Sequence, residues 1–331
     1  MKKSVTLMDI ARECNTSNVT VSKALADKSG VSEELRIKIK QTAEEMGYMP
    51  AKSSAVRRRN SVGILVPERY SSVSGSFYWT LYNYLSQKLK REGMYCVMET
   101  VGEREEQSLI MPDIVVDGKV KDVISMGQIS YRYAHRLADS VSSLVLMDYY
   151  VPGLKVDSVV SNGYNGSYKI TNYLFSMGHS RIAFVGTKTA TTSIFDRFMG
   201  YLKALIEHDV PMREDWIIPD RDEKGSIPIT LPKEMPTAFV CNCDETAFAV
   251  IKALRAGGYK VPQDVSVVGY DDYLISEMSD PAITTVSVDE EYMAELTVQT
   301  LMQRLRDPSV PCRMRSIEGE LVIKDSVIPL I

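Results

Sequence analysis

The side chains best suited to metal or nucleophilic chemistry are two closely spaced thiols, Cys241 and Cys243, together with three histidines. Two thiolates need further ligands at suitable spacing to hold a metal ion, and all three histidines lie far from this pair in the sequence. The five cysteines are odd in number and scattered, which argues against a disulfide framework. We therefore expect no metal, no cofactor and no disulfide.

Enzyme signatures are also missing from the sequence. It has no G-x-G-x-x-G fingerprint, no G-x-x-x-x-G-K-[ST] phosphate loop and no G-x-S-x-G elbow. His179 and the thiols form no evident nucleophile–base pair, so we expect no enzymatic activity. Two other classes remain as alternatives: a two-lobed cytosolic α/β enzyme acting on a sugar or nucleoside, and a free sugar-binding receptor, which would need export.

The distribution of charge favours a nucleic-acid partner. Residues 1–60 carry 12 Lys and Arg against 7 Asp and Glu, whereas the other residues carry 27 against 36, in a chain of net charge −4. A basic head on an acidic body is typical of a protein that binds phosphates through the head alone. The sequence shows neither a signal-peptide pattern nor an apolar run long enough to span a bilayer, so we expect a cytosolic protein.

The basic head has the pattern of three short helices. Thr6 and Asp9 fit a capping box, Thr16 or Ser17 can cap a second helix, and Ser32 can cap a third that ends near Gly47. Two helices joined by a tight turn form a helix-turn-helix, whose second helix enters the major groove of DNA. The outward face of that helix would carry groups suited to base edges and phosphates: Asn18, Val19, Thr20, Ser22 and Lys23.

The strings Val5-Thr6-Leu7-Met8-Asp9-Ile10-Ala11-Arg12 and Ser17-Asn18-Val19-Thr20-Val21-Ser22-Lys23-Ala24-Leu25 resemble the head of the lac repressor/galactose repressor family. So do Val31-Ser32 and Gly47-Tyr48-Met49-Pro50, and the resemblance continues through the chain. It implies that Asn18, Val19 and Lys23 read bases, and that Thr6, Ser17, Thr20, Ser22 and Ser32 contact phosphates.

The segment after Pro50 departs from the family pattern. The Asn that usually follows is Ala51, the segment is about one residue short, and Val56 replaces the usual Leu as the candidate wedge in the minor groove. Such a wedge kinks the duplex by unstacking a base step. The Arg57–Arg59 run offers two other interpretations: contacts to minor-groove phosphates, or a solvated basic linker.

Strands and helices alternate from Ser61 onward, which predicts an α/β core of two doubly wound lobes. We expect strands near 62–66, 95–99, 113–116, 123–126, 143–147, 157–161, 181–186, 237–241, 265–270 and 321–324. The main helices are expected near 77–91, 164–177, 196–208, 244–256 and 289–306.

The resemblance implies a core like that of periplasmic sugar-binding proteins, with the chain crossing between lobes near 160–162, 284–288 and 316–320. The expected domains are a helix-turn-helix head (1–49), a hinge (50–60), an N-terminal lobe (61–160 with about 288–316) and a C-terminal lobe (161–287 with about 317–331).

Four residues match effector contacts of the family. Arg197 occupies the position of an Arg that binds effector oxygens, Asp271 that of an accepting carboxylate, and Phe77 and Tyr78 that of stacking aromatics. Alternatively, these residues have structural roles and do not bind an effector: Arg197 and Asp271 form an ion pair, and the two aromatics belong to the hydrophobic core. The usual Asp before Gly163 and Asn before Asp244 are absent, so the resemblance implies a small polar effector, a sugar, without naming it.

The function implied is that of a repressor that binds a pseudo-palindromic operator as a homodimer, with operator affinity controlled by the effector. No heptad tail follows Glu318, so no tetramer-forming coiled coil is expected.

Overall fold

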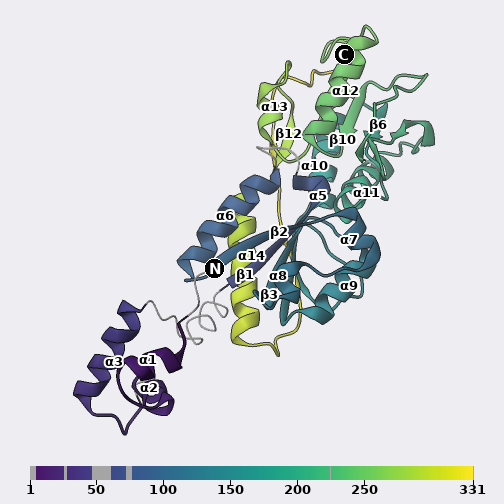
Figure 1. The fold of residues 1–331 in the computed structure, drawn as a ribbon. Helices are drawn as coiled ribbons and strands as arrows, with labels where there is room; N and C mark the ends of the chain where they lie inside the picture. Colours follow the sequence, from purple (N-terminus) through teal and green to yellow (C-terminus); the bar gives the residue numbers. More distant parts are fainter. Residues whose placement is uncertain (1–4, 26–27, 47–60, 72–76, 224, 331) are drawn as a thin grey trace. The chain divides into compact units, whose positions relative to one another are not determined.

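The computed structural model describes residues 5–25, 28–46, 61–71, 77–223 and 225–330. The chain divides into two compact units, Met1–Asn60 and Ser61–Ile331 (Figure 1). The first unit is the expected helical head, and the second is the α/β core.

Three helices lie in the described part of the head, α1 (Leu7–Glu13), α2 (Asn18–Leu25) and α3 (Glu33–Glu45). The expected capping box is present, since the Thr6 hydroxyl accepts from the Asp9 amide and the Asp9 carboxylate accepts from the Thr6 amide at 2.8 Å. Ser17, not Thr16, caps α2, with its hydroxyl accepting from the Thr20 amide at 3.1 Å. The apolar faces of the three helices meet in one small core formed by Ile10, Ala11, Cys14, Val21, Ala24, Ile39 and Ala43.

The core has one six-stranded parallel sheet in the order β13-β5-β4-β3-β1-β2. Its strands are β1 (Ser61–Pro67), β2 (Tyr95–Val101), β3 (Asp122–Met126), β4 (Ser143–Met147), β5 (Asp157–Ser161) and β13 (Met314–Ile317).

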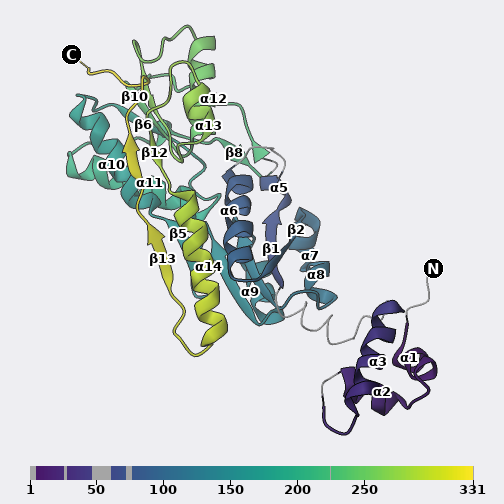
Figure 2. The same cartoon turned by 90° about the vertical axis from the view of Figure 1, so that its left-hand side faces the viewer.

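Both faces of this sheet are covered, which explains why inner strands such as β1 and β4 are continuous apolar runs. Alternate residues of β1 point to opposite faces: Ile64 packs in the cluster that includes α6 (Phe77–Arg91) and α14 (Glu290–Arg306), whereas Leu65 packs in the cluster that includes α9 (Tyr131–Ser140). Figures 1 and 2 show α6 and α14 side by side on one face, with α9 on the other.

A second, four-stranded parallel sheet has the order β11-β10-β6-β7, formed by β6 (Ile182–Val185), β7 (Ile217–Ile218), β10 (Ala238–Cys241) and β11 (Ser266–Val268). One face packs on α10 (Gly163–Ser176) and α11 (Thr192–Glu207), and the other packs on α12 (Asp244–Ala256). Helix α11 begins four residues earlier than the sequence predicts, so Arg197 lies in its second turn.

Shorter elements complete the core. They are α5 (Glu68–Ser71), α7 (Glu103–Ser108), α8 (Asp113–Val116), α13 (Leu274–Met278), the 3-10 turn Glu214–Trp216, and two antiparallel pairs, β8 (Arg221–Asp222) with β9 (Gly225–Ser226) and β12 (Thr285–Ser287) with β14 (Glu320–Val322).

The strand expected at 113–116 is wrong, because this segment is helix α8. Its β-branched residues favour a strand, but Pro112 opens the segment and the Glu99 carboxylate accepts from the amides of Asp113 (2.8 Å) and Ile114 (2.9 Å). This side chain from β2 therefore satisfies the first amides of a helix that has no cap of its own.

Candidate functional site

Helix α2 presents an exposed polar face. Asn18, Val19, Ser22 and Lys23 are exposed, while Val21 and Ala24 of the same helix are fully buried. The side chains of Asn18, Ser22 and Lys23 make no hydrogen bond with any described residue. Val19 is 64% exposed although it is apolar, which leaves its methyl groups accessible. This face is therefore open to a ligand outside the head, and its residue types are those that read base edges in the major groove.

Four of the five expected phosphate contacts, all except Ser22, lie at the starts of helices. Ser17 and Thr20 share a hydroxyl–hydroxyl hydrogen bond of 2.9 Å at the start of α2. Ser32 precedes α3 but makes no capping hydrogen bond, so its exposed hydroxyl is available. Thr6 donates its hydroxyl to Asp9 at 2.6 Å, which gives it a clear structural role in the cap. Val56, the expected wedge, lies outside the described residues.

In the core, the structure brings Arg197 and Asp271 together. Arg197 Nη2 donates to Asp271 Oδ1 at 2.8 Å, and the two side chains are only 7% and 17% exposed. The guanidinium also stacks over the Tyr270 ring, 3.8 Å from its centroid. Asp271 follows β11 and has a φ of +104°, an unfavourable value for a residue with a side chain. Such strain persists only where surrounding contacts impose it, as at binding sites.

The two expected aromatics have different places. Tyr78 donates its hydroxyl to Asp148 Oδ2 at 2.9 Å, while Phe77 packs against the hydrophobic core and meets the Tyr78 ring edge-on at 5.4 Å. Sequence reasoning missed Asp148, although it directly follows β4 and so obeys the rule that ligand contacts gather at the carboxyl ends of strands. Like Asp271, it has a positive φ, +68°.

The carboxyl groups of Asp148, Asp271 and Glu290 are near enough to interact electrostatically, and Asp271 pairs with Arg197. Burial raises the pKa of Asp148 to about 6, with Asp271 adding to the shift, and burial raises the pKa of Asp271 despite Arg197. Glu290 opens α14 and has no hydrogen-bond or ion-pair partner among the described residues. Burial raises its pKa to about 7, and the charges of Asp271 and Asp148 push it in the same direction. The site therefore has more acceptors than donors.

Contacts between the two lobes flank these carboxyl groups. Gln128, just after β3, accepts through Oε1 from the Thr192 amide of α11 at 2.8 Å and from its hydroxyl at 3.2 Å. Tyr150, near the end of β4, donates its hydroxyl to Asp196 at 3.1 Å. Since Asp196 precedes Arg197, the residues that hold the lobes together adjoin the candidate binding residue. A cavity of about 430 Å³ lies elsewhere, lined by α14 residues such as Val298 and Met302.

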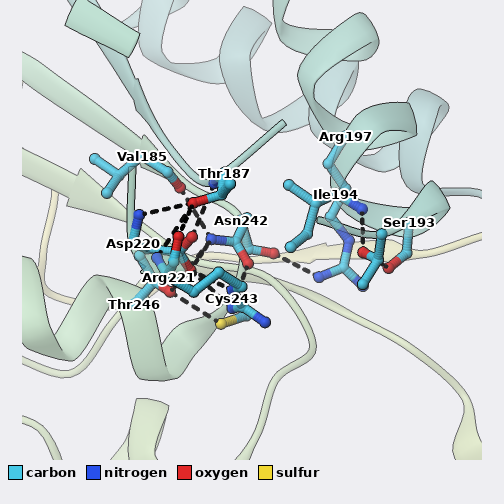
Figure 3. A network of polar contacts seen from close by, with 11 residues as sticks. Val185, Thr187, Ser193, Ile194, Arg197, Asp220, Arg221, Asn242, Cys243 and Thr246 are labelled. Carbon is cyan, nitrogen blue, oxygen red and sulfur yellow. Dashed lines mark hydrogen bonds and ion pairs between the residues drawn. The ribbon is translucent and has the colours of Figure 1, made fainter. Parts of the chain in front are cut away.

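A further polar network lies beside Arg197 (Figure 3). Asn242, just after β10, accepts from Arg197 Nη1 through its backbone oxygen and from Arg221 Nη2 through Oδ1 at 3.4 Å. Its Nδ2 donates to Asp220 Oδ2 at 2.8 Å. Sequence reasoning missed this network, whose members come from separate segments. Cys241 and Cys243 are free thiols, and within the described part of the chain no three His, Cys, Asp or Glu side chains are placed to hold a metal ion.

The comparisons with known proteins agree with this architecture. Residues 6–51 match the model for bacterial regulatory proteins of the lacI family, and residues 171–327 match the periplasmic binding protein-like domain. The ribose operon repressor of Haemophilus influenzae is 27% identical, over 98% of this chain and 99% of its own.

Two solved structures share the fold. The transcriptional regulator CelR in complex with cellobiose has a TM-score of 0.70 at 23% identity, covering 97% of this chain and 99% of its own. The lac repressor dimer bound to operator and the anti-inducer ONPF has a TM-score of 0.72 at 20% identity, covering 98% and 100%.

A helix-turn-helix head on a periplasmic-binding-protein-like core defines a DNA-binding regulator of transcription. Its head carries the lacI-family domain of bacterial regulatory proteins, and its core contains the periplasmic binding protein-like domain. The relatives named above are transcriptional regulators and repressors, not enzymes. No helix in the described ranges is long and apolar enough to cross a membrane.

Proposed function

We propose that this protein is a homodimeric repressor that binds a pseudo-palindromic operator through α2. A small polyhydroxylated effector that binds between the core lobes would lower or raise its affinity for the operator. The observation that carries the proposal is the exposed face of α2, where Asn18, Ser22 and Lys23 have no hydrogen-bond partner among the described residues. Two heads on a symmetric dimer would read two half-sites.

The effector site in this proposal is centred on Arg197 and Asp271, with Tyr78 beside them. Arg197 offers a planar donor fork and Asp271 offers only acceptors, which together suit the hydroxyl groups of a sugar. Because these groups now bind each other, an effector has to replace their contacts with its own. The cellobiose bound in the complex of the similar regulator CelR supports a sugar as the effector class.

The division of the chain into a head, a hinge and two core lobes is part of the same proposal. The hinge of residues 50–60 would connect head and core, with Val56 as the wedge that bends the operator. Residues 160–162, 284–288 and 316–320 would be the crossings between lobes. An effector that prefers one lobe arrangement would then change operator affinity by its difference in affinity for the two arrangements.

Selection of DNA fragments from a random pool with the full chain tests the DNA-binding half. We expect enrichment of one pseudo-palindromic site by the wild type, and no such enrichment by the Asn18→Ala/Lys23→Ala variant. Enrichment of the same site by both proteins would show that α2 does not read the bases. Turnover of sugars by the purified chain, measured in parallel, would favour the alternative of an enzyme.

A further inference from the structure

Arg221 is a second guanidinium close to the proposed effector site, and a buried scaffold holds it in place. Its Nε and Nη2 donate to Asp220 Oδ2 at 3.0 and 2.7 Å, and Nη2 also donates to Asn242 Oδ1. Asp220 is only 3% exposed and also accepts from Asn242 and from the Thr246 hydroxyl at 3.0 Å. This arrangement fixes one edge of the guanidinium and orients the other edge.

Asp220 stays ionised within this scaffold. Burial disfavours its charge, but the hydrogen bonds from Arg221 and Asn242 and the charge of Arg221 hold its pKa at about 2. Its Oδ1 accepts from the Thr187 amide at 2.8 Å. Both carboxylate oxygens of Asp220 therefore have hydrogen-bond donors, and Nη1 of Arg221 is not one of them. The N–H groups of Nη1 are therefore available to a ligand.

The unused edge of Arg221 lies among residues of the site. Nη1 makes no hydrogen bond with any described residue, and the side chain is 26% exposed. Tyr70, from the N-terminal side of the core, and Cys243, beside Asn242, are near enough to interact electrostatically with the guanidinium. Tyr70 stacks on Tyr78, with ring centroids 4.9 Å apart. Asn242 accepts from both Arg221 and Arg197, so Arg221 lies next to the proposed effector contacts.

Arg197 and Arg221 offer N–H donors, and Asp148, Asp271 and Glu290 offer carboxyl oxygens. Arg197 is already paired with Asp271, whereas Nη1 of Arg221 has no hydrogen-bond partner among the described residues. A complementary ligand has hydroxyl donors along one part and an anionic acceptor at the other, because a guanidinium pairs best with a carboxylate.

We propose that the effector is a sugar acid, a polyhydroxylated monocarboxylate whose carboxylate binds Arg221 while its hydroxyls bind Asp148, Asp271 and Glu290. This inference rests on the proposed effector site and adds the charge class of the ligand. It makes Arg221 the residue that distinguishes an acidic sugar from its neutral parent.

Calorimetric titration of the full chain tests this assignment with matched pairs of probes. Glucuronate, galacturonate and gluconate are compared with glucose, galactose and the neutral amide glucuronamide. We expect at least one acid to bind at least about tenfold more tightly than its neutral counterpart. Equal binding of acids and neutral sugars overturns the inference, and so does a lack of binding by both series. This comparison needs only the wild-type protein.

Variants then assign the preference to Arg221. We expect Arg221→Gln to lose the preference for the acid, and Arg221→Lys to retain part of it. Arg213→Gln is the matched control, because Arg213 pairs with Asp215 and Glu234 outside the site. An unchanged acid preference in Arg221→Gln overturns the assignment. Operator affinity measured on the same samples separates this failure from a failure of the proposed function, in which wild-type protein binds no specific DNA.

Discussion

Arg197 and Asp271 are each other's partners: Nη2 of the arginine lies 2.8 Å from Oδ1 of the carboxylate. Breaking a buried pair by removing one member leaves an uncompensated charge and costs roughly 3–5 kcal/mol. We therefore expect Arg197→Ala to lower the free energy of unfolding as well as abolish the effector response, since Asp271 would then face Asp148 and Glu290 without a cation. Urea unfolding measures the first effect.

The isosteric change Asp271→Asn is the control for that experiment. It removes the charge but keeps the shape and one acceptor oxygen, so it should cost less stability than Arg197→Ala and still weaken effector binding. Wild-type effector affinity in both variants would mean that the pair is structural and that the effector binds elsewhere.

A separate prediction concerns DNA binding by the head. Lys23→Ala should cost about 1–3 kcal/mol at the cognate operator and reduce discrimination between operator and random DNA. Thr20→Ala should weaken binding to all DNA to a similar extent, because its expected contact is a phosphate. Lys38→Ala, on the exposed surface of α3, is the charge-matched control. Fluorescence anisotropy with specific and random duplexes gives the affinities. Undiminished discrimination in Lys23→Ala would contradict the placement of the recognition helix.

Glu290 predicts a pH dependence of stability. Its pKa rises from an ordinary value of 4.5 to about 7 on folding, through burial and the nearby charges of Asp271, Asp148, Asp272 and Asp289. Between these two pKa values the Glu290 carboxyl group is ionised in the unfolded chain but still protonated in the folded chain. Its contribution to stability is thus complete below about pH 4.5 and is lost as pH rises through 7. Glu290→Gln should therefore gain stability relative to wild type between pH 5 and pH 8.

Glu291, the next residue on α14, should behave in the opposite way. Its carboxylate lies 2.8 Å from Lys88 Nζ, and this hydrogen bond lowers its pKa. The stability it contributes is present above its unfolded pKa and is lost on acidification. Glu291→Gln should lose stability relative to wild type at neutral pH, and the difference should shrink as pH falls. Urea midpoints at pH 5 and pH 8 measure both variants, and parallel trends would refute the assigned environments.

The contact between Tyr150 and Asp196 predicts a role in lobe closure. Tyr150→Phe removes the 3.1 Å hydrogen bond but little packing, so the lobe arrangement of this structure should lose about 0.5–1.5 kcal/mol. An effector that prefers this arrangement should then bind several-fold more weakly. Tyr168→Phe is the control, because Tyr168 donates to Glu207 on the exposed surface of the C-terminal part. The same effector affinity in both variants would exclude a closing role for Tyr150.

Local signals in the sequence predicted most of the fold. The capping box of Thr6 and Asp9 marked the start of α1, and continuous apolar runs such as Val62–Val66 marked strands buried on both faces. The failure at Asp113–Val116 has a long-range cause, since Glu99 from another strand satisfies the first amides of that helix. Contacts between distant segments leave no local pattern.

The candidate site also contains residues that the sequence predicts and residues that it does not. Arg197, Asp271 and Tyr78 carry recognisable neighbours in the sequence, and the structure places them around one space. Asp148 was accessible to the same reasoning as Asp271, because both follow core strands. Arg221 could not be predicted as a site residue, because its orientation depends on contacts with Asp220 and Asn242. These two residues come together only when the segments of β8 and β10 fold.

Coupling between effector binding in the core and operator binding by the head must obey thermodynamic reciprocity, which can be measured. With an effector found by screening, the operator dissociation constant is measured with and without saturating effector, and the effector dissociation constant with and without saturating operator. We expect both ratios to differ from one and to equal each other. An effector that binds tightly but leaves operator affinity unchanged would contradict the coupling of the two sites.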